Sequence, residues 1–146
     1  MRVFKDAECR EWNMTVNLRA VKALRAIGVD IMDETGGGIL ALSSDVCALG
    51  DALWTLCKSQ AEQRGITEEQ FYDGLHGDSI DAAGAALVDA IIDFFPNARR
   101  EILRRANQKM LAVQEKAIKL ASERIDQMDC ESVMNSQGSP ELTPEA

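Results

Sequence analysis

The sequence predicts a mostly helical α+β domain, in which an N-terminal β-hairpin precedes about five helices and a disordered C-terminal tail. Apolar residues recur at helical spacing through most of the chain, whereas the residues near the N-terminus alternate in polarity. Only 5% of residues are aromatic although 46% are hydrophobic, so the core must consist mainly of Ala, Leu, Ile and Val, as in closely packed helices. We expect one domain over residues 1–129 and a tail over residues 130–146.

The predicted hairpin occupies residues 2–16. Val3, and then Trp12, Met14 and Val16, lie on one side of short alternating runs, and the polar residues between them supply the turn. Because an isolated hairpin is only marginally stable in water, this one is expected to pack on helices or to pair with another chain.

Capping residues indicate where the first helices begin and end. Asn17 is expected to cap a short amphipathic helix that ends before Gly28, and Asp45 to cap a helix over residues 46–64. Thr67 and Gln70 match a capping box, which predicts a further short helix.

Two longer helices follow. The first, over about residues 79–95, is apolar nearly all round, which is typical of the buried centre of a bundle. Pro96 ends it, because residues before proline avoid the helical region. The second runs over about residues 98–128. After it the chain is rich in Ser, Pro and Glu, which favours disorder.

The stretch DETGGGILALSSD, residues 33–45, raises the question of a phosphate-binding loop. A P-loop needs a lysine and a hydroxyl residue directly after its glycines, and neither follows Gly38. A dinucleotide fingerprint would need a glycine where Ala41 stands, and Asp33 and Glu34 would repel phosphate. We interpret the glycines as a flexible connector and not as a nucleotide site.

Composition limits the remaining function classes. The net charge of −8 argues against general nucleic-acid binding, which depends on neutralising phosphates. The start of the chain has no apolar run typical of a signal peptide, and the longest apolar stretch is too short to span a bilayer. We therefore expect a cytoplasmic protein without membrane association.

The cysteines do not indicate a metal or disulfide framework. Cys9, Cys47, Cys57 and Cys130 form no CxxC pair, and the single His76 cannot complete a Cys/His zinc site. Cys47 and Cys57 are expected to be small core residues.

Candidate catalytic groups have simpler structural explanations. Asp89 and Asp93 stand at i and i+4 on one helix, but no third metal ligand accompanies them, so a solvated stripe or pairing with arginines is favoured. Glu68 and Glu69 suit the first turn of a helix, where acidic residues complement its dipole. His76 has no nucleophile near it in sequence. The sequence thus predicts no enzyme, catalytic residue or cofactor.

The last helix carries the strongest functional signal. Its apolar residues follow a 3,4,3,4,3 spacing, which is the a/d seam of a coiled coil. The seam residues, our candidate partner-binding residues, are Leu103, Ala106, Met110, Val113, Ala117 and Leu120. From Arg99 to Arg124 the helix has eight basic and three acidic residues, so its charge is 8 − 3 = +5.

Three interpretations of this helix stay open. The seam can pack on the chain's own bundle, or it can dock with another protein or a second copy. Alternatively, the basic face can hold nucleic acid. Since no aromatic residue lies between Arg99 and Ala146, this helix offers no ring on which single-stranded bases could stack.

The order of sequence signals resembles the small tail assembly chaperones of long-tailed bacteriophages, over roughly residues 2–105. The segments that carry the resemblance are Trp12, Gly28-Val29-Asp30, Leu53-Trp54, Gln60-Ala61, residues 65–71 (GITEEQF), Ala82-Ala83, Ala86-Leu87, residues 93–96 (DFFP) and Arg99-Arg100. The resemblance implies a non-enzymatic protein of the infected host's cytoplasm. It also implies binding to the helical tape-measure protein and recruitment of tail-tube subunits. The family has no motif from which individual binding residues can be transferred.

We therefore expect a phage tail assembly chaperone that forms homo-oligomers through the hairpin edge or the last helix. One alternative is another small phage morphogenesis protein, such as a connector or tail-completion component, which would remain in the finished particle. The other is a nucleic-acid-binding regulator that uses the basic last helix.

Overall fold

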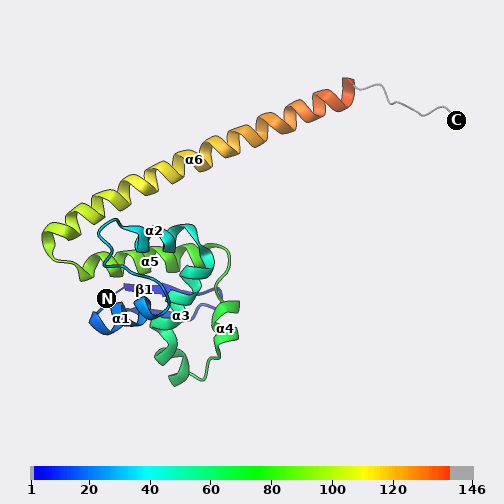
Figure 1. Cartoon of the computed structure of the whole chain (residues 1–146). Coiled ribbons are helices and arrows are strands. Elements are labelled where there is room, and N and C mark those ends of the chain that lie inside the picture. Colours follow the sequence, from blue (N-terminus) through cyan, green and yellow to red (C-terminus); the bar gives the residue numbers. More distant parts are fainter. Residues whose placement is uncertain (1, 139–146) are drawn as a thin grey trace. The chain divides into compact units, whose positions relative to one another are not determined.

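The computed structural model describes the backbone of residues 2–138 and the side chains of residues 2–128 (Figure 1). Over this range the chain forms a two-stranded antiparallel sheet and six helices, which confirms the predicted fold class. The chain divides into two compact units, with the boundary between Glu101 and Ile102. The expectation of a single domain over residues 1–129 stays a prediction.

The hairpin pairs β1 (Arg2–Lys5) with β2 (Glu11–Met14). Phe4 lies opposite Trp12 in the register, and both side chains face the core. Val3, predicted to lie on the same side as Trp12 and Met14, is instead 43% exposed, whereas those two side chains are buried. Directly opposed residues share one face of a sheet, so the pairing of Phe4 with buried Trp12 turns Val3 outward.

Helices α1 (Leu18–Ala26), α3 (Val46–Gln63) and α4 (Glu68–Asp73) begin where their capping residues predict. The Asn17 side chain accepts a hydrogen bond from the Ala20 amide, and the Asp45 side chain accepts hydrogen bonds from the first turn of α3. Both hydrogen bonds of the Thr67–Gln70 capping box are present.

The glycine stretch is not merely a connector, because it starts helix α2 (Gly37–Ser44), which the sequence interpretation missed. Gly36 precedes the helix with a φ of 75°, a left-handed conformation that favours glycine. A Cβ atom on Gly38 would overlap the backbone carbonyl of Asp30, so only glycine allows this close approach. Residues 29–32, between α1 and the glycines, form no strand and end in a turn.

Helix α5 (Asp78–Phe94) is the central element of the first unit. It packs against β1 and contacts α2, α3 and β2 (Figure 1). Its side chains at Leu87 and Ile91 are fully buried, and each such side chain stabilises the fold by about 2 kcal/mol. As predicted, α5 is buried over much of its surface.

An aromatic cluster joins the hairpin to the helices. The rings of Trp12 and Phe71 meet edge-on with their centroids 5.0 Å apart, and Trp54 packs on the same Phe71 ring at 5.4 Å. Trp12 and Phe71 are fully buried. This cluster fixes the hairpin, α3 and α4 to one another.

Helix α6 (Asn97–Gly138) is longer than predicted. The prediction ended the helix near Met128, where large apolar residues become sparse. No glycine or proline stands between that point and Gly138, so nothing in the backbone chemistry stops the helix earlier. The predicted disordered tail therefore begins with helical backbone, and its last part, residues 139–146, lies outside the described residues.

Candidate interaction surface

The predicted seam lies entirely on the part of α6 that belongs to the second unit. Val113 is 65% exposed and Leu120 is 58% exposed. Ala106 and Ala117 are also exposed, whereas Leu103 and Met110 are partly buried. The helix thus presents large apolar side chains to solvent, which is unusual for a soluble surface and typical of an interaction site.

The exposed apolar surface of α6 is broader than the predicted seam. After Ala117 further apolar positions follow at spacings of four, four and three residues. These spacings match the 3.6 residues per turn of a straight α-helix more closely than a strict heptad repeat does. We call this continuous set the apolar stripe. It consists of Leu103, Ala106, Met110, Val113, Ala117, Leu120, Ala121, Ile125 and Met128.

Two exposed side chains, Leu111 and Ile118, flank the apolar stripe on one side. Their exposed fractions are 48% and 70%, and Met128 at the end of the stripe is 63% exposed. The sequence interpretation missed Leu111, Ala121 and Met128 because it extended only the heptad spacing. The sequence signal that identifies these three residues is the recurrence of apolar positions at 3.6 residues per turn.

The other half of α6 is polar and mostly basic. Helical periodicity places Arg105, Lys109, Lys116 and Lys119 on this half, and all four side chains are exposed. Glu115 and Glu123 interrupt the positive charge. The helix is therefore amphipathic, with a wide apolar half and a mixed, net positive half.

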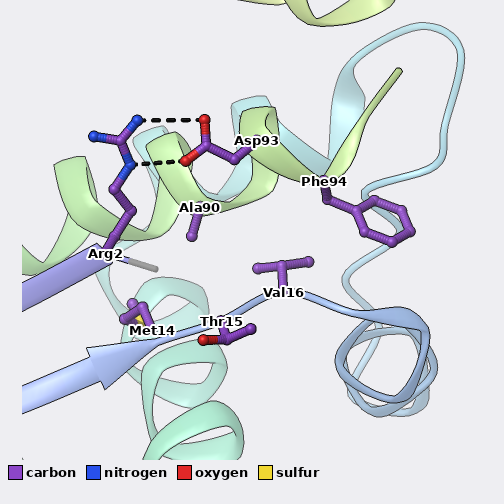
Figure 2. Close-up of a pocket in the computed structure, with 7 residues that line it drawn as sticks. All are labelled: Arg2, Met14, Thr15, Val16, Ala90, Asp93 and Phe94. Atoms are coloured by element: carbon purple, nitrogen blue, oxygen red, sulfur yellow. Dashed lines mark hydrogen bonds and ion pairs between the residues drawn. The ribbon is translucent and has the colours of Figure 1, made fainter. Parts of the chain in front are cut away.

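A small surface pocket in the first unit is a candidate for a ligand site (Figure 2). It has a volume of about 190 Å³ and lies between the N-terminus of β1, the chain just after β2 and the end of α5. Its lining residues are Arg2, Met14, Thr15, Val16, Ala90, Asp93 and Phe94.

The two charged groups of this pocket are paired with each other. The Arg2 guanidinium donates to both carboxylate oxygens of Asp93, with Nε 2.8 Å from Oδ2 (Figure 2). Arg100 donates to the backbone carbonyl of Asp93 at 3.2 Å and to that of Phe95 at the same distance. This confirms that Asp93 pairs with arginine, and it gives the pocket a structural role in fixing β1 to the end of α5.

A second polar cluster lies under the hairpin turn. The Asp6 carboxylate is almost fully buried and accepts hydrogen bonds from the Trp12 indole at 2.9 Å and from Arg10 Nε at 2.7 Å. The backbone amides of Glu8 and Arg10 also donate to it. Burial alone would raise the pKa of Asp6, but these hydrogen bonds and the Arg10 charge outweigh burial, so its pKa lies below the ordinary value. Every strong acceptor site of this carboxylate is thus used within the fold.

Two side chains of the first unit, Cys57 and Tyr72, are poorly suited to act as nucleophiles near neutral pH. Burial raises the pKa of the Cys57 thiol to about 12, so the thiolate is scarce. Partial burial and the neighbouring Glu68 and Asp51 carboxylates raise the pKa of Tyr72 to about 12. His76 lies in the turn between α4 and α5, with its Nδ1 3.0 Å from the Asp73 carbonyl oxygen. Among the described residues, no three His, Cys, Asp or Glu side chains gather closely enough to hold a metal ion.

Cys47 is exposed, so the prediction that it belongs to the core is wrong, whereas Cys57 is fully buried as predicted. Cys47 stands in the first turn of α3, on the side that faces away from the buried Leu49 and Leu53. Its position at the start of the helix, and not its residue type, decides its exposure.

No single helix in the described part of the chain has the length and apolar composition needed to cross a membrane. Taken together, α2 and α3 meet that test on composition, but they are bent by 107° at their junction.

Comparison with known proteins adds no relative from which a site could be transferred. The chain matches no protein-family model, no curated protein and no solved structure.

Proposed function

We propose that this protein is a non-enzymatic tail assembly chaperone of a long-tailed bacteriophage, which binds the helical tape-measure protein through the apolar stripe of α6. The observation that supports this most directly is the exposure of large apolar side chains along α6, including Val113, Ile118 and Leu120. An amphipathic helix of this kind binds another helix by burying its apolar face against that of the partner.

The proposal combines this surface with the sequence resemblance to tail assembly chaperones. A long, apolar, helical client needs its own apolar surface covered until assembly, and a long helix with a matching stripe can cover it. The net charge of −8 would keep such a complex soluble. On this proposal the protein acts in the cytoplasm of the infected host, recruits tail-tube subunits and is absent from the finished particle.

The test is co-expression with the tape-measure protein encoded by the same genome, followed by measurement of the soluble client. Val113→Asp/Leu120→Asp places two charges on the seam and should reduce soluble client to the level found without the chaperone. The matched control, Ala112→Asp/Ser122→Asp, adds the same charge to the polar half of α6 and should leave client solubility unchanged. Equal solubility with the two variants would contradict the proposal.

The basic half of α6 makes nucleic-acid binding the second candidate function. Arg105, Lys109, Lys116 and Lys119 are exposed and could contact phosphates. Such binding would weaken steeply between 50 and 200 mM salt, on the order of a hundredfold or more, whereas an apolar protein contact would not. Absorbance at 260 nm of the purified protein, together with a salt titration on labelled duplex DNA, separates the two functions.

A further inference from the structure

The charge of α6 changes sign along its length. Between residues 99 and 109 it carries five basic residues and one acidic residue, which gives 5 − 1 = +4. Between residues 123 and 131 the sequence has one basic and four acidic residues, which gives 1 − 4 = −3. The backbone is helical across both segments, so α6 has a basic beginning and an acidic end.

This polarity decides how two copies of α6 can lie side by side. A parallel pair in register would bring two +4 segments together, and two −3 segments together, at the spacing of packed helices. An antiparallel pair would place each basic segment beside an acidic one. Like charges close together cost free energy and opposite charges steer and fix the register, so the antiparallel arrangement is favoured.

The apolar stripe fits the same arrangement. Consider two antiparallel copies of α6 that lie side by side, with the centre of the pair between Glu115 and Lys116 of each copy. In this register Leu103 lies level with Met128 of the second copy. Ala106 lies level with Ile125, and Met110 with Ala121. A small side chain therefore meets a large one at two of these three levels, which is how facing helices interdigitate.

Charged side chains beside the stripe are matched in the same register. Lys109 of one copy and Glu123 of the second copy differ by one residue in their height along the pair. Arg104 and Asp126 of the second copy also differ by one residue. The described side chains of Lys109, Glu123 and Asp126 are exposed, and so are Val113 and Ile125 at 65% and 58%.

From these observations we infer that α6 is a self-association surface whose partner is the α6 helix of a second copy of this chain, paired antiparallel and centred between Glu115 and Lys116. The inference uses the same surface as the proposed function but does not require a client. A paired α6 covers the apolar stripe, so self-association and client binding compete for it.

The first test uses the purified full chain without any client. Light scattering across a concentration series should give the mass of a dimer, and a strictly monomeric mass at about 100 μM would overturn the inference. The orientation is tested with a spin label at Gln127→Cys in a chain whose four native cysteines are replaced by alanine or serine. Circular dichroism of this variant should match that of the original chain.

The label distance separates the two orientations. In the antiparallel register, Gln127 lies level with Arg104 of the second copy, so the two labelled positions are 23 residues apart along the axis. At 1.5 Å per residue this is about 35 Å. A parallel in-register pair would put the labels under about 20 Å apart, because packed helices lie about 10 Å from each other. The short distance would overturn the inference.

Charge reversal provides an independent test. Arg104→Glu/Arg105→Glu/Lys109→Glu should raise the dissociation constant of the dimer at least about tenfold, because both segments then become acidic. Mixing this variant with Glu123→Lys/Asp126→Lys should restore dimerisation. An unchanged dissociation constant would overturn the inference. A normal dimer that fails to keep the tape-measure protein soluble would instead contradict only the proposed function.

Discussion

The indole N–H of Trp12 donates a 2.9 Å hydrogen bond to the buried carboxylate of Asp6. The same carboxylate oxygen accepts from Arg10, whose guanidinium also donates to the Gln70 backbone carbonyl in α4 at 2.9 Å. Ala7 adds a backbone hydrogen bond to the Gly74 carbonyl at 2.8 Å. A single acidic residue of the hairpin turn thus connects the aromatic core to α4.

Replacing Asp6 with alanine should destabilise the protein by about 3 kcal/mol. The change leaves the buried Trp12 indole without its acceptor and removes the charge that pairs with Arg10. Urea unfolding followed by tryptophan fluorescence measures the loss. As the control, Glu62→Gln alters an exposed acidic residue near the end of α3 and should change stability by less than about 0.5 kcal/mol. Equal effects of the two substitutions would show that the Asp6 cluster does not stabilise the fold.

The contribution of Asp6 should also depend on pH. Because its pKa is lower in the folded protein than in the unfolded chain, the folded state binds fewer protons, and the contribution is present above the unfolded value of about 3.9. It is lost as pH falls through the folded pKa. The difference in unfolding free energy between the original chain and Asp6→Asn should therefore shrink when pH is lowered from 7 towards 3. A difference that grows over this range would contradict the assignment.

Two glycine substitutions should have opposite effects on stability. Gly38→Ala should destabilise the protein by about 1–3 kcal/mol, because its Cβ would overlap the Asp30 carbonyl. Gly50→Ala, in the interior of α3, should stabilise it by about 0.5–1 kcal/mol. Its Cβ meets only the Tyr72 ring, at an ordinary contact distance of 3.7 Å. Thermal unfolding of both variants measures the effects, and a stabilising Gly38→Ala would contradict the described start of α2.

Thiol reactivity should distinguish the cysteines whose side chains are described. Cys9 and Cys47 are exposed and should react with a maleimide at pH 7, whereas the buried Cys57 should react only after unfolding. Peptide mapping by mass spectrometry after short labelling, with and without urea, measures this. Rapid labelling of Cys57 in the native protein would contradict its burial.

Features that depend on near neighbours in the chain could be predicted from the sequence. The caps at Asn17, Asp45 and Thr67 need only the amides two or three residues ahead, and all three are present. Burial of α5 followed from its apolar residues on nearly every side.

Features that depend on contacts distant in sequence could not be predicted. The start of α2 requires Gly38 to pass close to the Asp30 backbone, and three consecutive glycines by themselves disfavour a helix. Alternation identifies the two faces of β1 but not which of them is buried, and pairing with Trp12 decides in favour of Phe4. Nothing in the sequence signals that Asp6 is buried, because its partners come together only in the folded hairpin.

The candidate site was predicted in part. The heptad spacing identified the seam from Leu103 to Leu120, which the structure places on one helix. It missed Ala121 and Met128 because a 3.5-residue repeat drifts around a helix of 3.6 residues per turn. Whether this surface binds a client or a second copy depends on the partner, which sequence periodicity does not identify.

The central claim is that the apolar stripe of α6 serves binding and not the stability of the chain's own core. The most direct measurement is the unfolding free energy of Val113→Asp/Leu120→Asp relative to the original chain, followed by the fluorescence of Trp12 and Trp54, which both lie in the first unit. At a concentration where both proteins are monomeric, we predict a change below about 0.5 kcal/mol, as for exposed positions. A loss of about 3 kcal/mol or more would mean that these side chains are buried in the native core, and it would contradict the account.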